Sequence, residues 1–133
     1  MPLFRKIQLW YDLACNNYNI VTAKTISFNG EIAITPSAGT ATVDWTAGQY
    51  QKVTLNAAPV TLSFTAPKGP GKFTLRLLQD GSGSRTVSWA SISPLYWQSK
   101  TAPTLTSAAG STDFVVFYYD GYSYWGSYGL NWG

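Results

Sequence analysis

The side chains that carry most enzyme chemistry are scarce in this sequence. Its 133 residues include no histidine and a single cysteine, Cys15. Without histidine, neither a Ser-His-Asp site nor a Cys-His site can be built, and most zinc sites are excluded as well. Cys15 has no base to activate it and no partner for an internal disulfide, so we interpret it as a small buried hydrophobe.

Six carboxylates remain, and a glycoside hydrolase needs only two. They are Asp12, Glu31, Asp44, Asp80, Asp113 and Asp120. Asp80 and Asp120 each precede a glycine in a predicted turn, where aspartate usually accepts hydrogen bonds from the backbone. Asp113 opens a predicted strand, and Asp44 alternates with apolar neighbours, which points it to solvent or into a subunit contact. We therefore predict no catalytic residue. No acidic loop or phosphate loop is present, so we predict no metal and no cofactor.

The charge pattern argues against nucleic-acid and membrane partners. The formal net charge is +3, and the nine lysines and arginines are scattered along the chain. Nucleic-acid binding needs a basic stripe, and none is found. No segment approaches the roughly 18 consecutive apolar residues of a membrane span. Polar residues soon after the start also argue against a signal peptide.

The elements that would position any site are predicted to be strands, and the strongest pattern covers residues 72–90. Apolar residues alternate with more polar ones on both sides of a turn at 79–84, which is the period of two half-buried strands. The pattern predicts a β-hairpin. Its predicted inward face consists of Phe73, Leu75, Leu77, Val87 and Trp89.

Similar short runs recur from residue 20 onward. The predicted strands span 21–28, 31–35, 41–45, 51–55, 60–65, 73–77, 86–89, 113–119 and 122–130. Asn29-Gly30 predicts a hairpin between the first two. The run 113–119 is apolar on both faces, so we expect it to be buried on both sides or covered on one side by another subunit. Residues 93–103 are predicted to cross without regular pairing.

About nine or ten short strands, with no helix predicted after residue 20, indicate an all-β fold. We expect an antiparallel β-sandwich or a jelly-roll-like barrel, formed by a single domain over residues 20–133. Residues 1–19 differ from the rest and form an N-terminal arm or first element. Their apolar spacing fits a helix and, almost as well, a strand. They either pack on their own domain or dock on a neighbouring subunit.

The order of motifs over residues 32–129 resembles a module that is frequent in bacteriophage virion proteins. The resemblance rests on Thr35-Pro36-Ser37-Ala38-Gly39, a Val-Asp-Trp strand, Val60-Thr61-Leu62-Ser63-Phe64, Gln79-Asp80-Gly81, Thr86-Val87-Ser88-Trp89, Thr101-Ala102-Pro103-Thr104-Leu105, 113–119 and a closing strand of glycines and aromatics. Such modules occur in tail-fibre and spike proteins and in head decoration or cement proteins. The resemblance implies a non-enzymatic β-sandwich that assembles, often as a homotrimer.

Aromatic residues are more abundant than one core can easily hold. Tyrosine and tryptophan are favoured where the apolar ring is buried and its polar O–H or N–H group reaches solvent, as at interfaces and sugar-binding sites. The candidate interface residues are Leu3, Phe4, Ile7, Trp10, Tyr11, Trp97, Tyr122, Tyr124, Trp125, Tyr128 and Trp132. The dense run 118–132 fits a terminal hairpin with paired aromatics, a subunit or capsid interface, or a glycan site.

These patterns lead to two hypotheses. The first is a structural virion protein, a capsid decoration or cement protein that contacts itself, the major capsid protein and other virion proteins. A short tail-fibre or spike component is a variant of this hypothesis. The second is a receptor module that binds a host surface glycan on a platform of Tyr122, Tyr124, Trp125 and Tyr128. Both predict a virion location and no enzyme activity.

Overall fold

The computed structural model describes residues 24–133, and this part of the chain is nearly all β. Its strands are β1 (Ile32–Ile34), β2 (Thr40–Asp44), β3 (Tyr50–Leu55), β4 (Val60–Thr65), β5 (Gly71–Gln79), β6 (Val87–Ser88), β7 (Leu95–Trp97), β8 (Thr112–Tyr119) and β9 (Tyr124–Trp132). The helical content of the described residues is one 3-10 turn, η1 (Gln98–Lys100). The all-β expectation is confirmed.

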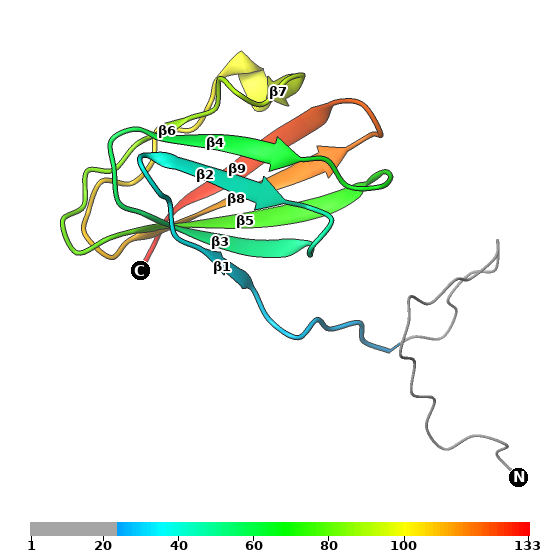
Figure 1. Cartoon of the computed structure of the whole chain (residues 1–133), viewed down its shortest axis with the longest axis horizontal. Coiled ribbons are helices and arrows are strands. Elements are labelled where there is room, and N and C mark those ends of the chain that lie inside the picture. Colours follow the sequence, from blue (N-terminus) through cyan, green and yellow to red (C-terminus); the bar gives the residue numbers. More distant parts are fainter. Residues whose placement is uncertain (1–23) are drawn as a thin grey trace, which may run out of the picture.

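The strands form two sheets, and in Figure 1 β4 of the smaller sheet overlaps β9 of the larger one. The larger sheet has the order β1-β3-β5-β8-β9-β7, and the smaller has the order β2-β4-β6. From β1 to β6 the chain alternates between the sheets, so each strand pairs with the strand two places before it and runs parallel to it. Parallel pairing requires a long connection. Here the strand in the opposite sheet supplies that connection, and no helix is needed.

The expected antiparallel arrangement is wrong for most of the fold. Among the strand pairs of residues 24–133, only β5–β8 and β8–β9 are antiparallel, whereas β7 runs parallel to β9 at one edge of the larger sheet. The smaller sheet is entirely parallel. An alternating sequence determines which face of a strand is buried, but it carries no information about the direction of the neighbouring strand.

The predicted hairpin over 72–90 is also wrong, because its two strands belong to different sheets. β5 pairs with β3 and β8, while β6 pairs with β4. Buried Gln79 helps to direct the chain away from β5. Its side-chain amide donates to the carbonyl oxygen of Arg85 at 2.9 Å and accepts from the N–H of Arg85 at 2.8 Å. The predicted inward face nevertheless packs on the core, fully in β5 and partly around β6.

Three further expectations differ from the structure. Of the predicted strand 21–28, residues 24–28 form no strand, and residues 21–23 lie outside the described part. Asn29-Gly30 makes no hairpin, because β1 pairs with β3 instead. The segment 93–103 does contain a paired strand, β7. Strand β8 is buried by its own domain on one face only, because Val116 and Tyr118 on its other face are exposed; burial of both faces within the chain is therefore wrong, while cover of the open face by another subunit stays a prediction.

Both sheets contribute to one hydrophobic core. Phe64 of β4 and Phe117 of β8 make an edge-to-face contact across the two sheets, with ring centroids 5.0 Å apart. The buried core residues are Ala41, Val43, Trp45, Val53, Leu55, Val60, Leu62, Phe73, Leu75, Leu77, Ile92, Val115, Phe117, Tyr119 and Tyr124. Among residues 24–133 no helix is long and apolar enough to cross a membrane.

Candidate functional site

The outer face of the six-stranded sheet, which points away from the smaller sheet, carries most of the exposed aromatic surface. Side chains alternate along each strand, so the apolar residues between the core positions point outward. In β8 these are Phe114, Val116 and Tyr118, and β9 adds Trp125. A monomeric protein seldom exposes a large contiguous apolar area without a function for it. This face is therefore the candidate site.

Three aromatic residues lie side by side in the register of neighbouring strands. Tyr118 of β8 pairs with Trp125 of β9, and Trp125 pairs with Tyr96 of β7. We call these three residues the aromatic row. Each is about half exposed. Lys72 of β5 pairs with Tyr118 and closes the row at its other end.

The ring of Trp125 is held from two sides. Its indole Nε1–H donates a hydrogen bond of 2.9 Å to Oδ2 of Asp120. The ring of Tyr96 stacks on it, with centroids 4.7 Å apart and planes inclined by 28°. Such offset stacking is a favourable aromatic geometry. The orientation of Trp125 is thus established by the protein itself.

Asp120 belongs to the turn between β8 and β9. Its Oδ1 accepts hydrogen bonds from the backbone N–H groups of Ser123 at 2.7 Å and Tyr122 at 2.8 Å. The hydrogen bond from the Ser123 N–H, followed by those from the Trp125 indole and the Tyr122 N–H, holds the pKa of this carboxyl below its ordinary value. Asp120 therefore stays ionised at neutral pH and connects the turn to the aromatic row.

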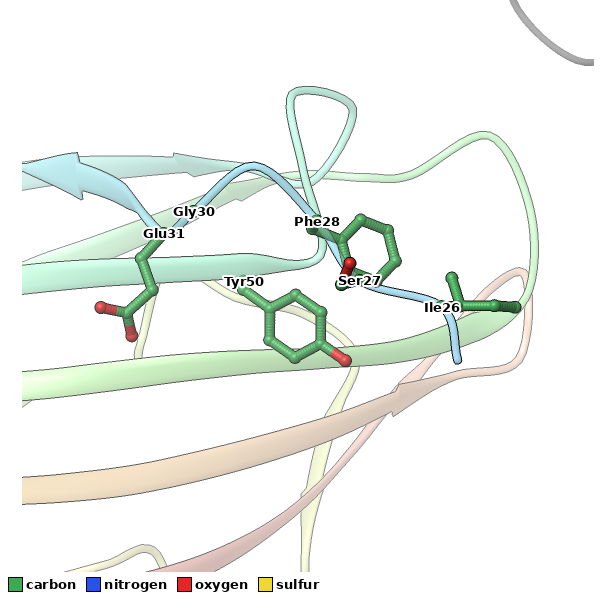
Figure 2. A pocket seen from close by; sticks show the side chains of 6 residues that line it. All are labelled: Ile26, Ser27, Phe28, Gly30, Glu31 and Tyr50. Atoms are coloured by element: carbon green, nitrogen blue, oxygen red, sulfur yellow. The ribbon is translucent and has the colours of Figure 1, made fainter. Parts of the chain in front are cut away.

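A second exposed region lies at the opposite edge of the same sheet, where the described chain enters β1. We call it the N-terminal edge, made of Ile26, Phe28 and Tyr50 (Figure 2). Ile26 is 65% exposed and Phe28 is 50% exposed. The rings of Phe28 and Tyr50 are 5.1 Å apart, and the region borders an open hollow of about 330 Å³.

Glu31 also borders this hollow, and it is ion-paired. Its carboxylate accepts from Arg76 of β5, with Oε2 2.6 Å from Nη2. This hydrogen bond holds the pKa of Glu31 below its ordinary value. The hollow is thus lined mainly by the large side chains of Ile26, Phe28 and Tyr50, and the carboxylate that borders it is paired with Arg76.

The other described carboxylates take part in structural contacts. Asp80 forms an ion pair of 2.8 Å with Arg85, and Asp44 accepts from the backbone and hydroxyl of Thr46. Hydrogen bonds from these partners hold both pKa values below their ordinary range. Buried Asp113 accepts from neighbouring backbone and hydroxyl groups. Within residues 24–133 no three His, Cys, Asp or Glu side chains gather where they could hold a metal ion.

The candidate interface residues lie in several places. Leu3, Phe4, Ile7, Trp10 and Tyr11 fall outside the described residues. Trp97 and Tyr128 lie on the inner side of the larger sheet, where their rings contact each other, and Tyr128 is partly exposed there. Trp132 is exposed and contacts Phe114 on the outer side.

The expected four-residue glycan platform does not form a single surface. Tyr124 is only 5% exposed and belongs to the core, whereas Trp125 points to the opposite face of the same strand. Tyr122 is 77% exposed but lies in the turn before β9. Neighbouring residues of a strand point to opposite faces, so the alternation in 122–130 already carried the signal that these rings are separated.

Sequence reasoning missed several residues of the exposed surface. Tyr96 was missed because its segment was not expected to pair, although β7 is a strand. Tyr118 could have been found from the alternation within 113–119, which places it on the same face as Val116. Ile26 and Phe28 were assigned to a strand that does not form.

Comparison with known proteins identified no relative. No family model matches the sequence, and neither the curated proteins nor the solved structures include a match.

Proposed function

We propose that this chain is a non-enzymatic structural protein of a bacteriophage virion, of the capsid decoration or cement type. In this proposal the two sheets form a β-sandwich with jelly-roll-like character that binds other virion subunits. Its partners are further copies of itself, as a homotrimer, and the major capsid protein. The support from sequence is the resemblance over residues 32–129 to modules of virion proteins.

The observation that carries the proposal is the exposed N-terminal edge. Ile26 and Phe28 present apolar surface directly after a segment that is itself rich in apolar residues, including Ile7 and Trp10. The cores of stable protein interfaces are enriched in aromatic and apolar side chains and depleted in charge. The N-terminal edge has this character, since its nearest carboxylate, Glu31, is neutralised by Arg76.

The outer surface of β8 adds a second line of support. The sequence of this strand is apolar on both faces, yet Val116 and Tyr118 are exposed. An apolar strand face that its own domain leaves open is expected where another subunit covers it. Burial of apolar area contributes about 25 cal/mol per Å² before the costs of association are subtracted.

The test is the mass and hydrodynamic size of the purified chain, with and without residues 1–19. An oligomer that dissociates to a monomer on truncation supports assembly through the N-terminal region. A full-length chain that is monomeric, and that the truncation leaves unchanged, overturns the proposal.

A pair of variants tests whether the oligomer depends on the N-terminal edge in particular or on apolar surface in general. The double variant Ile26→Ser and Phe28→Ser is expected to weaken the oligomer. Its control is Leu78→Ser, which also removes an apolar side chain, from β5. Equal weakening by both would contradict a specific role for the N-terminal edge.

A further inference from the structure

We infer that the aromatic row, Tyr96, Trp125 and Tyr118, is a binding platform for an uncharged oligosaccharide. Pyranose rings present faces of C–H groups that stack on aromatic rings, while their hydroxyl groups form hydrogen bonds around the rim. The structure provides both elements, three half-exposed aromatic side chains and a polar rim. This platform differs from the one expected from the sequence, with which it shares only Trp125.

The first argument is that the central ring is oriented before any ligand arrives. Trp125 is fixed by its hydrogen bond to Asp120 and by the stacked ring of Tyr96. Asp120 is in turn held by two backbone N–H groups of its turn. Fixing a side chain in its binding orientation removes part of the entropy cost of binding. Asp120 therefore acts as a positioning residue for Trp125.

The second argument is the spacing of the row. Its members come from three adjacent strands and are paired in register, so their backbones are separated by about 4.8 Å from one strand to the next. This spacing is close to the length of one pyranose unit. Because the ring of Tyr96 covers one face of the Trp125 indole, a sugar unit would stack on the other face of Trp125, and the neighbouring units of an extended chain across β8, β9 and β7 would contact the exposed parts of Tyr118 and Tyr96.

The third argument is charge. The described residues of the row and its ends carry two charges, Lys72 and Asp120, and Asp120 is occupied by internal hydrogen bonds. A polyanion such as nucleic acid needs several cations along its path. One lysine suits a single hydroxyl or carbonyl acceptor at the end of a neutral chain. The polar neighbours Thr74 and Ser127, next along β5 and β9 on the same face, suit hydroxyl groups as well.

The platform lies on β7, β8 and β9, whereas the N-terminal edge lies at β1 and β3, the other end of the sheet order. The N-terminal edge and the platform can therefore be used at the same time. Tyr118 belongs to the platform, so a sugar chain bound there and a subunit covering the outer surface of β8 would exclude each other. Glycan binding does not depend on the proposed virion assembly, and each can fail without the other. The oligomer measurement above tests assembly, and a binding titration tests the platform.

The experiment is a titration of the full chain with three neutral hexasaccharides, maltohexaose, cellohexaose and chitohexaose, followed by tryptophan fluorescence and by NMR of the indole N–H groups. We expect at least one sugar to bind with a dissociation constant of about 0.1–1 mM, a range typical of weak binding by few contacts. We expect the indole N–H signal of Trp125, assigned by its loss in Trp125→Phe, to shift on binding.

Variants define the site. Trp125→Ala and Tyr96→Ala are expected to weaken binding by about tenfold or more, equivalent to about 1.4 kcal/mol. Asp120→Asn is expected to shift the Trp125 indole signal in the free protein and to weaken binding, while the other indole signals stay in place. The control is Phe114→Ala, an outer-face aromatic in β8 that lies outside the row, and it is expected to bind as the unmodified chain does.

Three outcomes would overturn the inference. The first is that none of the three sugars binds or shifts the Trp125 signal. The second is that a sugar binds equally well to Trp125→Ala and to the unmodified chain. The third is that the row binds oligoproline and no sugar, because aromatic grooves also accept proline-rich peptides. Circular dichroism of each variant distinguishes a lost contact from a lost fold.

Discussion

Trp97 occupies the space directly over Gly126, its partner in the register of β7 and β9. A Cβ atom at position 126 would lie 2.5 Å from Cζ3 and 2.7 Å from Cε3 of Trp97. The indole thereby reaches Trp89, at a centroid distance of 5.0 Å, and Phe117, at 5.9 Å. The absence of a side chain at Gly126 is therefore what allows the edge strand β7 to close this end of the core.

Substituting Gly126→Ala should destabilise the fold, because Trp97 would have to leave its position between Trp89 and the sheet. Overpacking of this kind costs about 1–3 kcal/mol in the free energy of unfolding. Denaturant unfolding measures the loss. The matched control is Gly129→Ala, where the new Cβ would meet Nε1 of exposed Trp132 at 3.1 Å. That ring is free to move, so the control should change stability by less than about 0.5 kcal/mol. Equal losses would contradict this account of Trp97.

Tyr119 and Tyr124 form a natural comparison, because their rings are 4.7 Å apart and their hydroxyl groups differ in partners. The hydroxyl of Tyr119 donates to the carbonyl oxygen of Gly121 at 2.9 Å. The buried hydroxyl of Tyr124 has no hydrogen-bond partner among the described residues. Removing an unsatisfied buried hydroxyl is expected to increase stability, whereas removing a bonded one decreases it.

Tyr124→Phe should therefore raise the free energy of unfolding by about 1 kcal/mol at neutral pH, and Tyr119→Phe should lower it by about 1 kcal/mol. Thermal or denaturant unfolding of the two variants checks the pair of signs. If both variants lose stability by similar amounts, the Tyr124 hydroxyl is bonded after all.

The same hydroxyl predicts a pH dependence. Burial raises the pKa of Tyr124 to about 12, with a smaller contribution from the charge of Tyr119, whereas the ordinary value is 10.0. Between these values the unfolded chain loses the proton and the folded chain keeps it, so stability falls as pH rises from about 10 to about 12. Tyr124→Phe removes this component, and its advantage over the unmodified chain should grow across that window. An advantage that is constant with pH would argue against the raised pKa.

Asp113 fastens two segments to the start of β8. Its carboxylate accepts from the N–H of Thr106 at 2.7 Å, from the hydroxyl of Thr106 at 2.8 Å and from the N–H of Asn131 at 2.9 Å. Asp113→Asn places an amide NH₂ against a set of donors, so we expect a loss of about 1–3 kcal/mol in unfolding free energy. Asp44→Asn, in a more exposed turn, should cost less. A neutral effect of Asp113→Asn would show that these three contacts do not require a carboxylate.

Much of the local structure follows from the sequence alone. The inward positions of β3, β4 and β5, such as Val53, Leu62 and Leu75, are buried as their alternation predicts, because successive side chains of a strand point to opposite faces. The two aspartates before glycine, Asp80 and Asp120, accept backbone hydrogen bonds in turns, as their type and position indicate. These features depend only on residues close to one another in the chain.

The tertiary structure alone decided which strands are neighbours and therefore what the exposed surface contains. Leu75 pairs with Gln51 on one side and Val115 on the other, and nothing in its local pattern specifies either partner or its direction. The stack of Tyr96 on Trp125 exists only because β7 pairs with β9 in parallel. A period of two residues determines the face of a strand, whereas partner and direction are decided by how both sheets together bury one core.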